Sequence, residues 1–201
     1  MILNKQTLPV CGKIDCETTG RFIAYRFYDF SEECMLYVCN YDSPIGSITM
    51  ASNGYALVGL WVDEQKQFAV DFCEVEWTKD LPIFEQTKQW LDSYFSGANP
   101  TFTPLTEMVD ESAFRQRVWK IVCDIPFGQT LTYGQIAKQI ETETGKRVSA
   151  QAVGGALANN RVLLVIPCHR VVGVSGSLTG YAGGLDKKEW LLAMEKANSR
   201  S

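Results

Sequence analysis

The chain changes its hydrophobic period near its midpoint, and this change limits the folds open to it. Between residues 35 and 62, short β-prone runs at 37–41, 45–51 and 56–62 are separated by turn-forming pairs. One of these pairs, Asn53-Gly54, predicts a type I′ hairpin turn. Beyond residue 112 the apolar residues recur at helical spacing. The sequence therefore predicts an α+β fold, with a small antiparallel sheet followed by a mostly helical region.

Helical spacing and capping residues predict four helices. They begin at Pro82 and after the N-cap residues Ser112, Thr132 and Ser149. Thr132 and Gln135 also fit a capping box. A polar turn at residues 141–147 joins the last two helices, which makes them a candidate helix-turn-helix motif. Ahead of residue 35 the periodicity is weak, although Phe22, Ala24, Tyr28 and Phe30 could contribute a strand.

The second helix of this motif, residues 150–158, is built mainly from small side chains. Its two mid-helix glycines, Gly154 and Gly155, each cost roughly 1 kcal/mol relative to alanine. The backbone there must approach a bulky partner closely. Packing against another helix and contact with an external partner explain this pattern equally well.

Composition and charge narrow the class of protein. With 46% hydrophobic and 21% charged residues, the chain is typical of a globular protein. No apolar run approaches the ~20 residues of a membrane span, and the start lacks a signal core, so a cytoplasmic location is expected. Residues 1–95 carry seven Lys/Arg against 14 Asp/Glu, and residues 96–201 carry 12 against nine. This asymmetry is compatible with DNA binding confined to the second half.

The seven cysteines are an odd number, and free thiols in a reducing compartment explain them most simply. Cys11 and Cys16 repeat the spacing of Cys34 and Cys39, which leaves a four-thiolate zinc site open. Because zinc knuckles usually have tighter spacing, we predict no metal site.

A continuous apolar run at residues 162–166 predicts a buried strand that leads into Pro167, Cys168 and His169. A neighbouring imidazole can lower a thiol pKa and so produce a nucleophile. His169 is the only histidine of the chain. Taken alone, however, such a pair is more often a core cysteine beside a core histidine.

Several ordered motifs resemble those of the O6-alkylguanine-DNA alkyltransferases, the methylated-DNA–protein-cysteine methyltransferase family. The segment Ile166-Pro167-Cys168-His169-Arg170-Val171-Val172 is similar to the active-site signature of that family. Other blocks that resemble the family, in order and spacing, lie at residues 114–119, 126–128, 132–133, 152–156, 159–160, 180–185 and 188–195. The similarity is strong over residues 112–196 and weaker over residues 36–104.

The resemblance implies a fold and a domain organisation. A ribonuclease H-like N-terminal α/β domain with its linker would occupy residues 36–104. A winged-helix-like, mostly helical domain for DNA binding and alkyl transfer would occupy residues 105–201, while residues 1–35 form an extension of unclear role.

The resemblance also implies a reaction and its residues. Cys168 would attack the alkyl carbon bound to O6 of guanine, or the alkyl carbon bound to O4 of thymine. This step would be stoichiometric, would inactivate the protein and would need no cofactor. His169 would be the general base acting through a water, and Glu195 would orient the imidazole. Tyr133 would donate a proton or hydrogen bond to guanine, and Asn160 would pin the turn beneath the thiol.

DNA is the partner that the resemblance implies. A monomer without membrane contact would bind double-stranded DNA through the minor groove, largely independently of sequence, and would flip the target base. The implied contacts to the flipped base come from Leu157, Val171, Tyr181 and Ala182. The implied contacts to DNA come from Arg147, Ser149, Gln151, Ala152, Gly154 and Arg170.

Two positions depart from the family pattern. Gln151 stands where the family usually has an arginine that inserts behind the flipped base, so we expect weaker flipping or slower repair than with arginine. Arg161 stands where proline is frequent, which leaves the turn less rigid. The Gln151 departure keeps a second interpretation open, namely a damage sensor or DNA-binding regulator with poor transfer activity. A thiol hydrolase is a weaker third candidate, because the helix-turn-helix would be unexplained.

Overall fold

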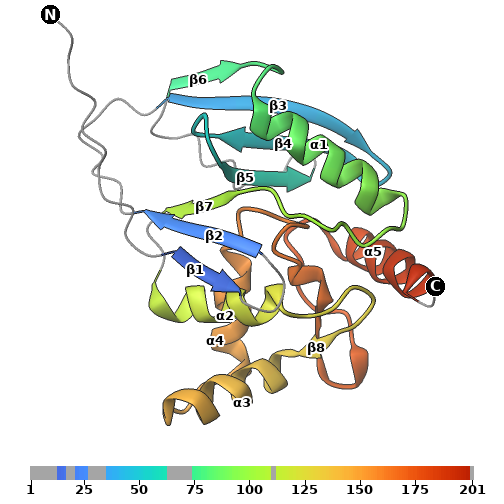
Figure 1. Ribbon diagram of the computed structural model, residues 1–201. Coiled ribbons are helices and arrows are strands. Elements are labelled where there is room, and N and C mark those ends of the chain that lie inside the picture. The colour runs from blue at the N-terminus through green and yellow to red at the C-terminus, as the bar shows by residue number, and fades with distance from the viewer. Residues whose placement is uncertain (1–12, 17–20, 27–34, 63–73, 110–111, 200–201) are drawn as a thin grey trace, which may run out of the picture.

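A computed structural model describes residues 13–16, 21–26, 35–62, 74–109 and 112–199. Strands from the first part of the chain form one sheet, with the helices α2, α3 and α4 on the opposite side of the molecule (Figure 1). The strands are β1 (Lys13–Cys16), β2 (Arg21–Arg26), β3 (Met35–Ser43), β4 (Gly46–Ser52), β5 (Leu57–Val62), β6 (Glu74–Trp77) and β7 (Thr106–Val109). The mixed α+β class predicted from the sequence is thus confirmed.

The sheet has the order β1-β2-β7-β5-β4-β3-β6 and is only partly antiparallel. The meander β3-β4-β5 at its centre is antiparallel, as predicted, whereas β6 pairs parallel to β3 and β7 pairs parallel to β2 and β5. The predicted antiparallel sheet is therefore present in the meander, while the parallel pairs that β6 and β7 add to it were not predicted. Hairpin turns dictate antiparallel pairing only where strands follow each other directly, and longer segments lead to β6 and β7.

The prediction of a type I′ turn at Asn53-Gly54 was wrong. Residues 53–56, rather than two residues, connect β4 to β5. Gly54 has a φ of +95°, but Leu164 and Ser175 are the only non-glycine residues with positive φ in the described segments. Instead, the side chain of Asn53 accepts hydrogen bonds from the N–H groups of Tyr55 at 3.1 Å and Ala56 at 3.0 Å. The asparagine side chain thereby stabilises a wider turn.

Residues 13–16 and 21–26 extend the sheet at one edge. β1 pairs antiparallel with β2, and β2 pairs with β7. Phe22 and Ala24 lie in β2, whereas Tyr28 and Phe30 are outside the described residues.

Helix α1 (Pro82–Phe95) packs on β3 and β4 through its apolar face. That face includes Phe84, Leu91 and Tyr94, all of which are buried. The helix begins at Pro82, as predicted, and Ser96 is its C-cap.

The second half contains α2 (Ala113–Cys123), α3 (Tyr133–Thr144), α4 (Ala150–Ala158) and α5 (Leu185–Asn198). The predicted N-caps are present: Ser112, Thr132 and Ser149 each accept a backbone N–H, and Gln135 completes the capping box. Two-residue strands β8 (Leu131–Thr132) and β9 (Val171–Val172) and the short 3-10 helices η1 (Cys168–Arg170) and η2 (Val174–Gly176) complete this half. Helices α3 and α4 form the predicted helix-turn-helix.

Residues 162–166 are buried as predicted, but they do not form a strand. Val162 makes an isolated bridge to Leu60 of β5, and Leu163 makes another to Ile166, so the segment folds back on itself. Leu164, at the bend, has a φ of +67°. A continuous apolar run indicates burial but not shape, which explains why the strand prediction failed.

A single hydrophobic cluster joins the sheet, α1 and the C-terminal helices. None of the helices in the described parts of the chain is long and apolar enough to span a membrane.

Candidate active site

Cys168 is the first residue of η1 and is 6% exposed. Asn160 lies beneath it, and its Nδ2 donates to the carbonyl of Ile166 at 3.0 Å and to Sγ of Cys168 at 3.2 Å. The Oδ1 of Asn160 accepts the N–H of Val162 at 3.0 Å. Because an N–H donor at sulfur favours the thiolate over the thiol, Asn160 can shape the turn and also stabilise charge on Cys168.

His169 and Glu195 form a pair inside the protein, and both side chains are fully buried. Nε2 of His169 lies 2.8 Å from Oε1 of Glu195. Since an ionised carboxylate only accepts hydrogen bonds, we assign the proton of the neutral imidazole to Nε2. Nδ1, which is buried and has no hydrogen-bond partner within the described residues, is then free to accept a proton.

Three further groups surround the carboxylate of Glu195. The hydroxyl of Tyr94 donates to Oε1 at 2.6 Å, and the N–H of Gly128 donates to Oε2 at 3.0 Å. Nε of Arg170 donates to Oε2 at 2.9 Å, and its Nη2 donates to Oε1 at 2.9 Å. A buried carboxylate needs such compensation to remain charged.

This environment sets the protonation states. Burial raises the pKa of Glu195, but hydrogen bonds and charge from His169 and Arg170 outweigh it and hold the pKa well below 4.5. Burial lowers the pKa of His169 below 6.5, against the opposing effect of Glu195. Burial also raises the pKa of Cys168 to about 11, although the hydrogen bond from Asn160 and the charge of Lys188 lower it. At neutral pH the site therefore contains a carboxylate, a neutral imidazole and a thiol, so the thiol needs a base to react.

A pocket of about 1080 Å³ opens above Cys168. Its lining includes Tyr133 at the start of α3 and Tyr181 in the loop before α5. Leu157, Ala182 and Gln151 also line it. The hydroxyl of Tyr133 donates to the carbonyl of Thr179 at 3.0 Å. Burial raises the pKa of Tyr133, so its hydroxyl stays protonated at neutral pH and can act as a donor.

Lys188 anchors the loop that forms one side of this pocket. Its Nζ donates to the carbonyls of Val171 at 2.6 Å, Thr179 at 2.9 Å and Gly180 at 3.3 Å. The side chain is fully buried and lies over the Tyr133 ring at 5.9 Å. Val171 itself is buried beside η1 in β9.

Helix α4 borders the pocket and presents small side chains to the outside. Ser149, Gln151, Ala152 and Gly155 are exposed. A Cβ added at Gly155 would meet no atom within 4 Å, and one at Gly154 would only reach the Tyr133 ring at 3.8 Å. Packing inside the protein therefore does not require either glycine. The other explanation, close approach of an external partner, is favoured.

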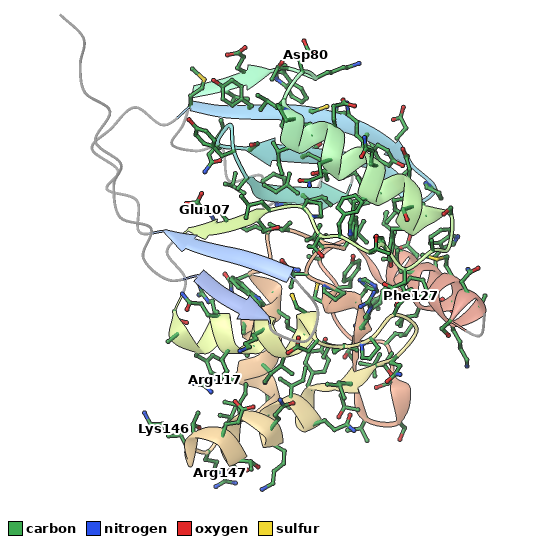
Figure 2. All side chains as sticks on the ribbon, viewed as in Figure 1. Asp80, Glu107, Arg117, Phe127, Lys146 and Arg147 are labelled. Atoms are coloured by element: carbon green, nitrogen blue, oxygen red, sulfur yellow. The ribbon has the colours of Figure 1, made fainter. Side chains whose placement is uncertain are left out.

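Arg147 and Lys146 project from the turn between α3 and α4, at the far end of α3 (Figure 2). Arg170, by contrast, is 3% exposed; besides Glu195 it binds the carbonyl of Ile125 at 2.7 Å. The expectation that Arg170 contacts DNA was therefore wrong, because its guanidinium is occupied inside the protein. The motif alone could not distinguish a surface cation from a buried one.

Tyr94, Gly128 and Lys188 belong to this site but were not recognised in the sequence. Lys188, Leu191 and Glu195 are buried at spacings i, i+3 and i+7 on α5. Two charged residues on the same helix face as a core leucine indicate buried charges, and this pattern can be read from the sequence. Tyr94, on the apolar face of α1, carried no such signal.

No group of His, Cys, Asp or Glu side chains that could hold a metal ion occurs among the described residues. The zinc alternative involved Cys11 and Cys34, which lie outside the described segments, and Cys16, whose side chain is not described. Of the four thiols, Cys39 is described, and it is free and buried.

Together, the fold and the site define a helix-turn-helix protein with a buried cysteine nucleophile at the base of an open pocket. Two family models match the chain, the ribonuclease-like domain of 6-O-methylguanine DNA methyltransferase over residues 36–106 and its DNA binding domain over residues 113–197. The chain belongs to the 6-O-methylguanine DNA methyltransferase family.

Relatives of similar length support this assignment. A methylated-DNA–protein-cysteine methyltransferase of Mycobacterium tuberculosis is 39% identical over 165 residues, covering 82% of this chain and 95% of the relative. One from Methanosarcina barkeri is 41% identical over 162 residues, covering 79% and 96%. A crystal structure of the M. tuberculosis protein in complex with DNA matches with a TM-score of 0.68 and 36% identity, covering 81% of this chain and 94% of that one.

Proposed function

We propose that this protein repairs DNA by moving an alkyl group from O6 of guanine directly to Cys168. One observation carries the proposal: Cys168 and the small-residue helix α4 line one pocket, and the buried His169–Glu195 pair begins at the residue that follows Cys168 in η1. The names of the relatives give the same activity.

In the proposed reaction, His169 Nδ1 takes the thiol proton through a bridging water. The sulfur then attacks the alkyl carbon, so an S–C bond forms while the C–O6 bond breaks and its electron pair leaves with guanine. Tyr133 exchanges its bond to the Thr179 carbonyl for one to guanine and stabilises the leaving base. Asn160 stabilises the thiolate, and Glu195 balances the charge that develops on His169. Cys168 ends as a thioether, so each molecule reacts once.

The target carbon is inaccessible within stacked duplex DNA, and the nucleotide must therefore be flipped into the pocket. We assign the exposed face of α4 to the minor groove, where small side chains let the backbone approach the sugars. Ser149, Gln151, Ala152 and Gly154 would form this contact, with Arg147 near a phosphate. The pocket residues Leu157, Tyr181 and Ala182 would hold the base, together with Val171 of β9 beside η1. Such binding depends on phosphates and shape, so it is largely independent of sequence, and one copy of the chain suffices.

A cytoplasmic location fits this function. Cys39 and Cys168 are free thiols, as expected in a reducing compartment.

The alternative is a damage sensor that binds lesions and transfers little. Gln151 favours it, since this glutamine lines the pocket where the family pattern has an arginine. A glutamine offers neither the charge nor the stacking surface of a guanidinium behind a flipped base.

One experiment separates the two functions. The protein is incubated with an equimolar duplex containing one O6-methylguanine, and its intact mass and tryptic peptides are measured. We expect the mass to rise by one methylene unit, located on Cys168, with no change for Cys168→Ser. Tight binding of the duplex by a protein of unchanged mass would instead establish the sensor.

A further inference from the structure

The hydroxyl of Tyr94 reaches the candidate active site from the other half of the chain. Tyr94 lies on α1, which packs on the sheet, whereas His169 and Glu195 belong to η1 and α5. Its oxygen is 2.6 Å from Oε1 of Glu195 and 3.2 Å from Nε2 of His169. All three side chains are buried.

Oε1 of Glu195 thus receives both the Tyr94 O–H and the His169 N–H. The two donors compete for the same negative charge. While Tyr94 donates, less of that charge is available to stabilise a protonated imidazole. The ring of Tyr94 is fixed by stacking on Trp90 at 5.3 Å and by an edge contact with Phe127 at 6.0 Å, so its hydroxyl is held in place.

We propose that Tyr94 is a positioning residue that sets the basicity of His169 by sharing the carboxylate of Glu195. The inference concerns the general base of the proposed function, but His169 can be observed without any reaction. Through Tyr94, the sheet domain takes part in the chemistry of the helical half.

The other ionisable groups around His169 and Glu195 are the same in wild type and in a variant that lacks only the Tyr94 hydroxyl. Arg170 and Lys188 oppose protonation of His169, and Cys168 and Tyr181 are close on the pocket side. Tyr181 contacts the His169 ring edge-on at 6.3 Å. A change at the Tyr94 hydroxyl alone removes none of these groups.

The test uses the single histidine of the full-length chain. Its imidazole nitrogen resonances are followed by NMR against pH in wild type and in Tyr94→Phe, which keeps the ring and removes the hydroxyl. We expect the His169 pKa to rise by about one unit in the variant, the equivalent of one typical hydrogen bond. The acidic limb of the methyl-transfer rate should move to higher pH by the same amount.

A matched control is the hydroxyl of Tyr41 in β3, which bonds a residue of the same helix. The hydroxyl of Tyr41 donates to Asp92 of α1 at 2.6 Å, the same distance, but lies outside the site. Tyr41→Phe should leave the titration of His169 unchanged. An unshifted His169 pKa in Tyr94→Phe, or an equal shift in Tyr41→Phe, would overturn the proposal.

A second variant guards against misfolding. Replacing Tyr94 with difluorotyrosine keeps the shape and makes the hydroxyl a stronger donor, so the His169 pKa should fall instead of rise. If the resonances shift as expected while wild type transfers no methyl group, the Tyr94 inference stands and the proposed function fails. If transfer occurs without opposite shifts in the two variants, the function stands and this inference fails.

Discussion

At the scale of single residues, the site depends on one carboxylate with many partners. Glu195 accepts hydrogen bonds from Tyr94, His169, Arg170 and the backbone of Gly128. These groups come from three segments of the chain, since His169 and Arg170 are neighbours in η1, so Glu195 fixes the relative positions of the segments as well as the tautomer of His169. Loss of any one donor leaves the buried negative charge of Glu195 less well compensated.

Asn160 has a similar role for the nucleophile, and Asn160→Ala tests it. The substitution leaves the buried N–H of Val162 without its acceptor, while the Ile166 carbonyl keeps the N–H of Cys168. We expect unfolding in urea to show a loss of about 1–3 kcal/mol. Without the N–H donor at Sγ, methyl transfer should slow roughly tenfold.

Asn159→Ala is the matched control for this prediction. The exposed side chain of Asn159 bonds only the carbonyl of Gly155, at 2.8 Å. Its removal should change neither quantity appreciably. Equal effects of the two substitutions would contradict the role of Asn160.

At the scale of elements, the sequence predicted those whose signals are local. The caps Ser112, Thr132 and Ser149 located α2, α3 and α4 because a cap side chain binds backbone only two or three residues away. The direction of β6 and β7 and the fold-back of residues 162–166 depend instead on distant partners. No local pattern encodes these partners, which is why the strand prediction at residues 162–166 failed and the parallel strands β6 and β7 were not predicted.

Helix α4 offers a prediction that separates stability from binding. Alanine at Gly155 meets no neighbouring atom, so Gly155→Ala should raise the free energy of unfolding by about 0.5–1 kcal/mol. The added methyl lies on the face that we assign to the minor groove, and DNA affinity should therefore fall. Thermal melting and fluorescence anisotropy with a labelled duplex measure the two effects.

Gly145 provides the contrasting case. It ends α3 with a φ of +69°, where alanine is strained by roughly 1–2 kcal/mol. Gly145→Ala should therefore destabilise the protein. If Gly155→Ala were stabilised and bound DNA as tightly as wild type, α4 would not be the helix that enters the groove.

At the scale of the whole molecule, the site combines residues from both halves of the chain. The nucleophile, base and carboxylate could be proposed from the sequence because they lie within motifs near each other, at residues 160–195. Tyr94 could not, since only the packing of α1 brings it within reach. Arg170 was misplaced for the same reason: its burial results from the assembled fold.

This buried cluster should make the protein sensitive to acid. The folded pKa of His169 is lowered from 6.5 and that of Glu195 from 4.5, so unfolding is coupled to proton uptake by both groups. Their contribution to stability is fully present above pH 6.5. It should decline as pH falls below 6.5 through His169, and more steeply below 4.5 through Glu195.

Urea unfolding of wild type and Glu195→Gln between pH 7 and 3 measures this. The variant leaves the buried Arg170 without its carboxylate, so it should be less stable at pH 7 by about 3–5 kcal/mol and should lose stability less steeply below pH 4.5. Glu189→Gln, an exposed change on the same helix, should follow wild type. Parallel curves for wild type and Glu195→Gln would be inconsistent with the assigned protonation states.

The bridge between Leu60 and residues 161–163 has a consequence for how the protein is made. The N–H and carbonyl of Leu60 bind Arg161 and Leu163, which a ribosome adds about a hundred residues later. During synthesis this part of the β5 edge must wait for the segment that carries the nucleophile. A chain that ends before residue 161 therefore contains neither this contact nor the nucleophile, so the pocket and its reactive thiol are completed together.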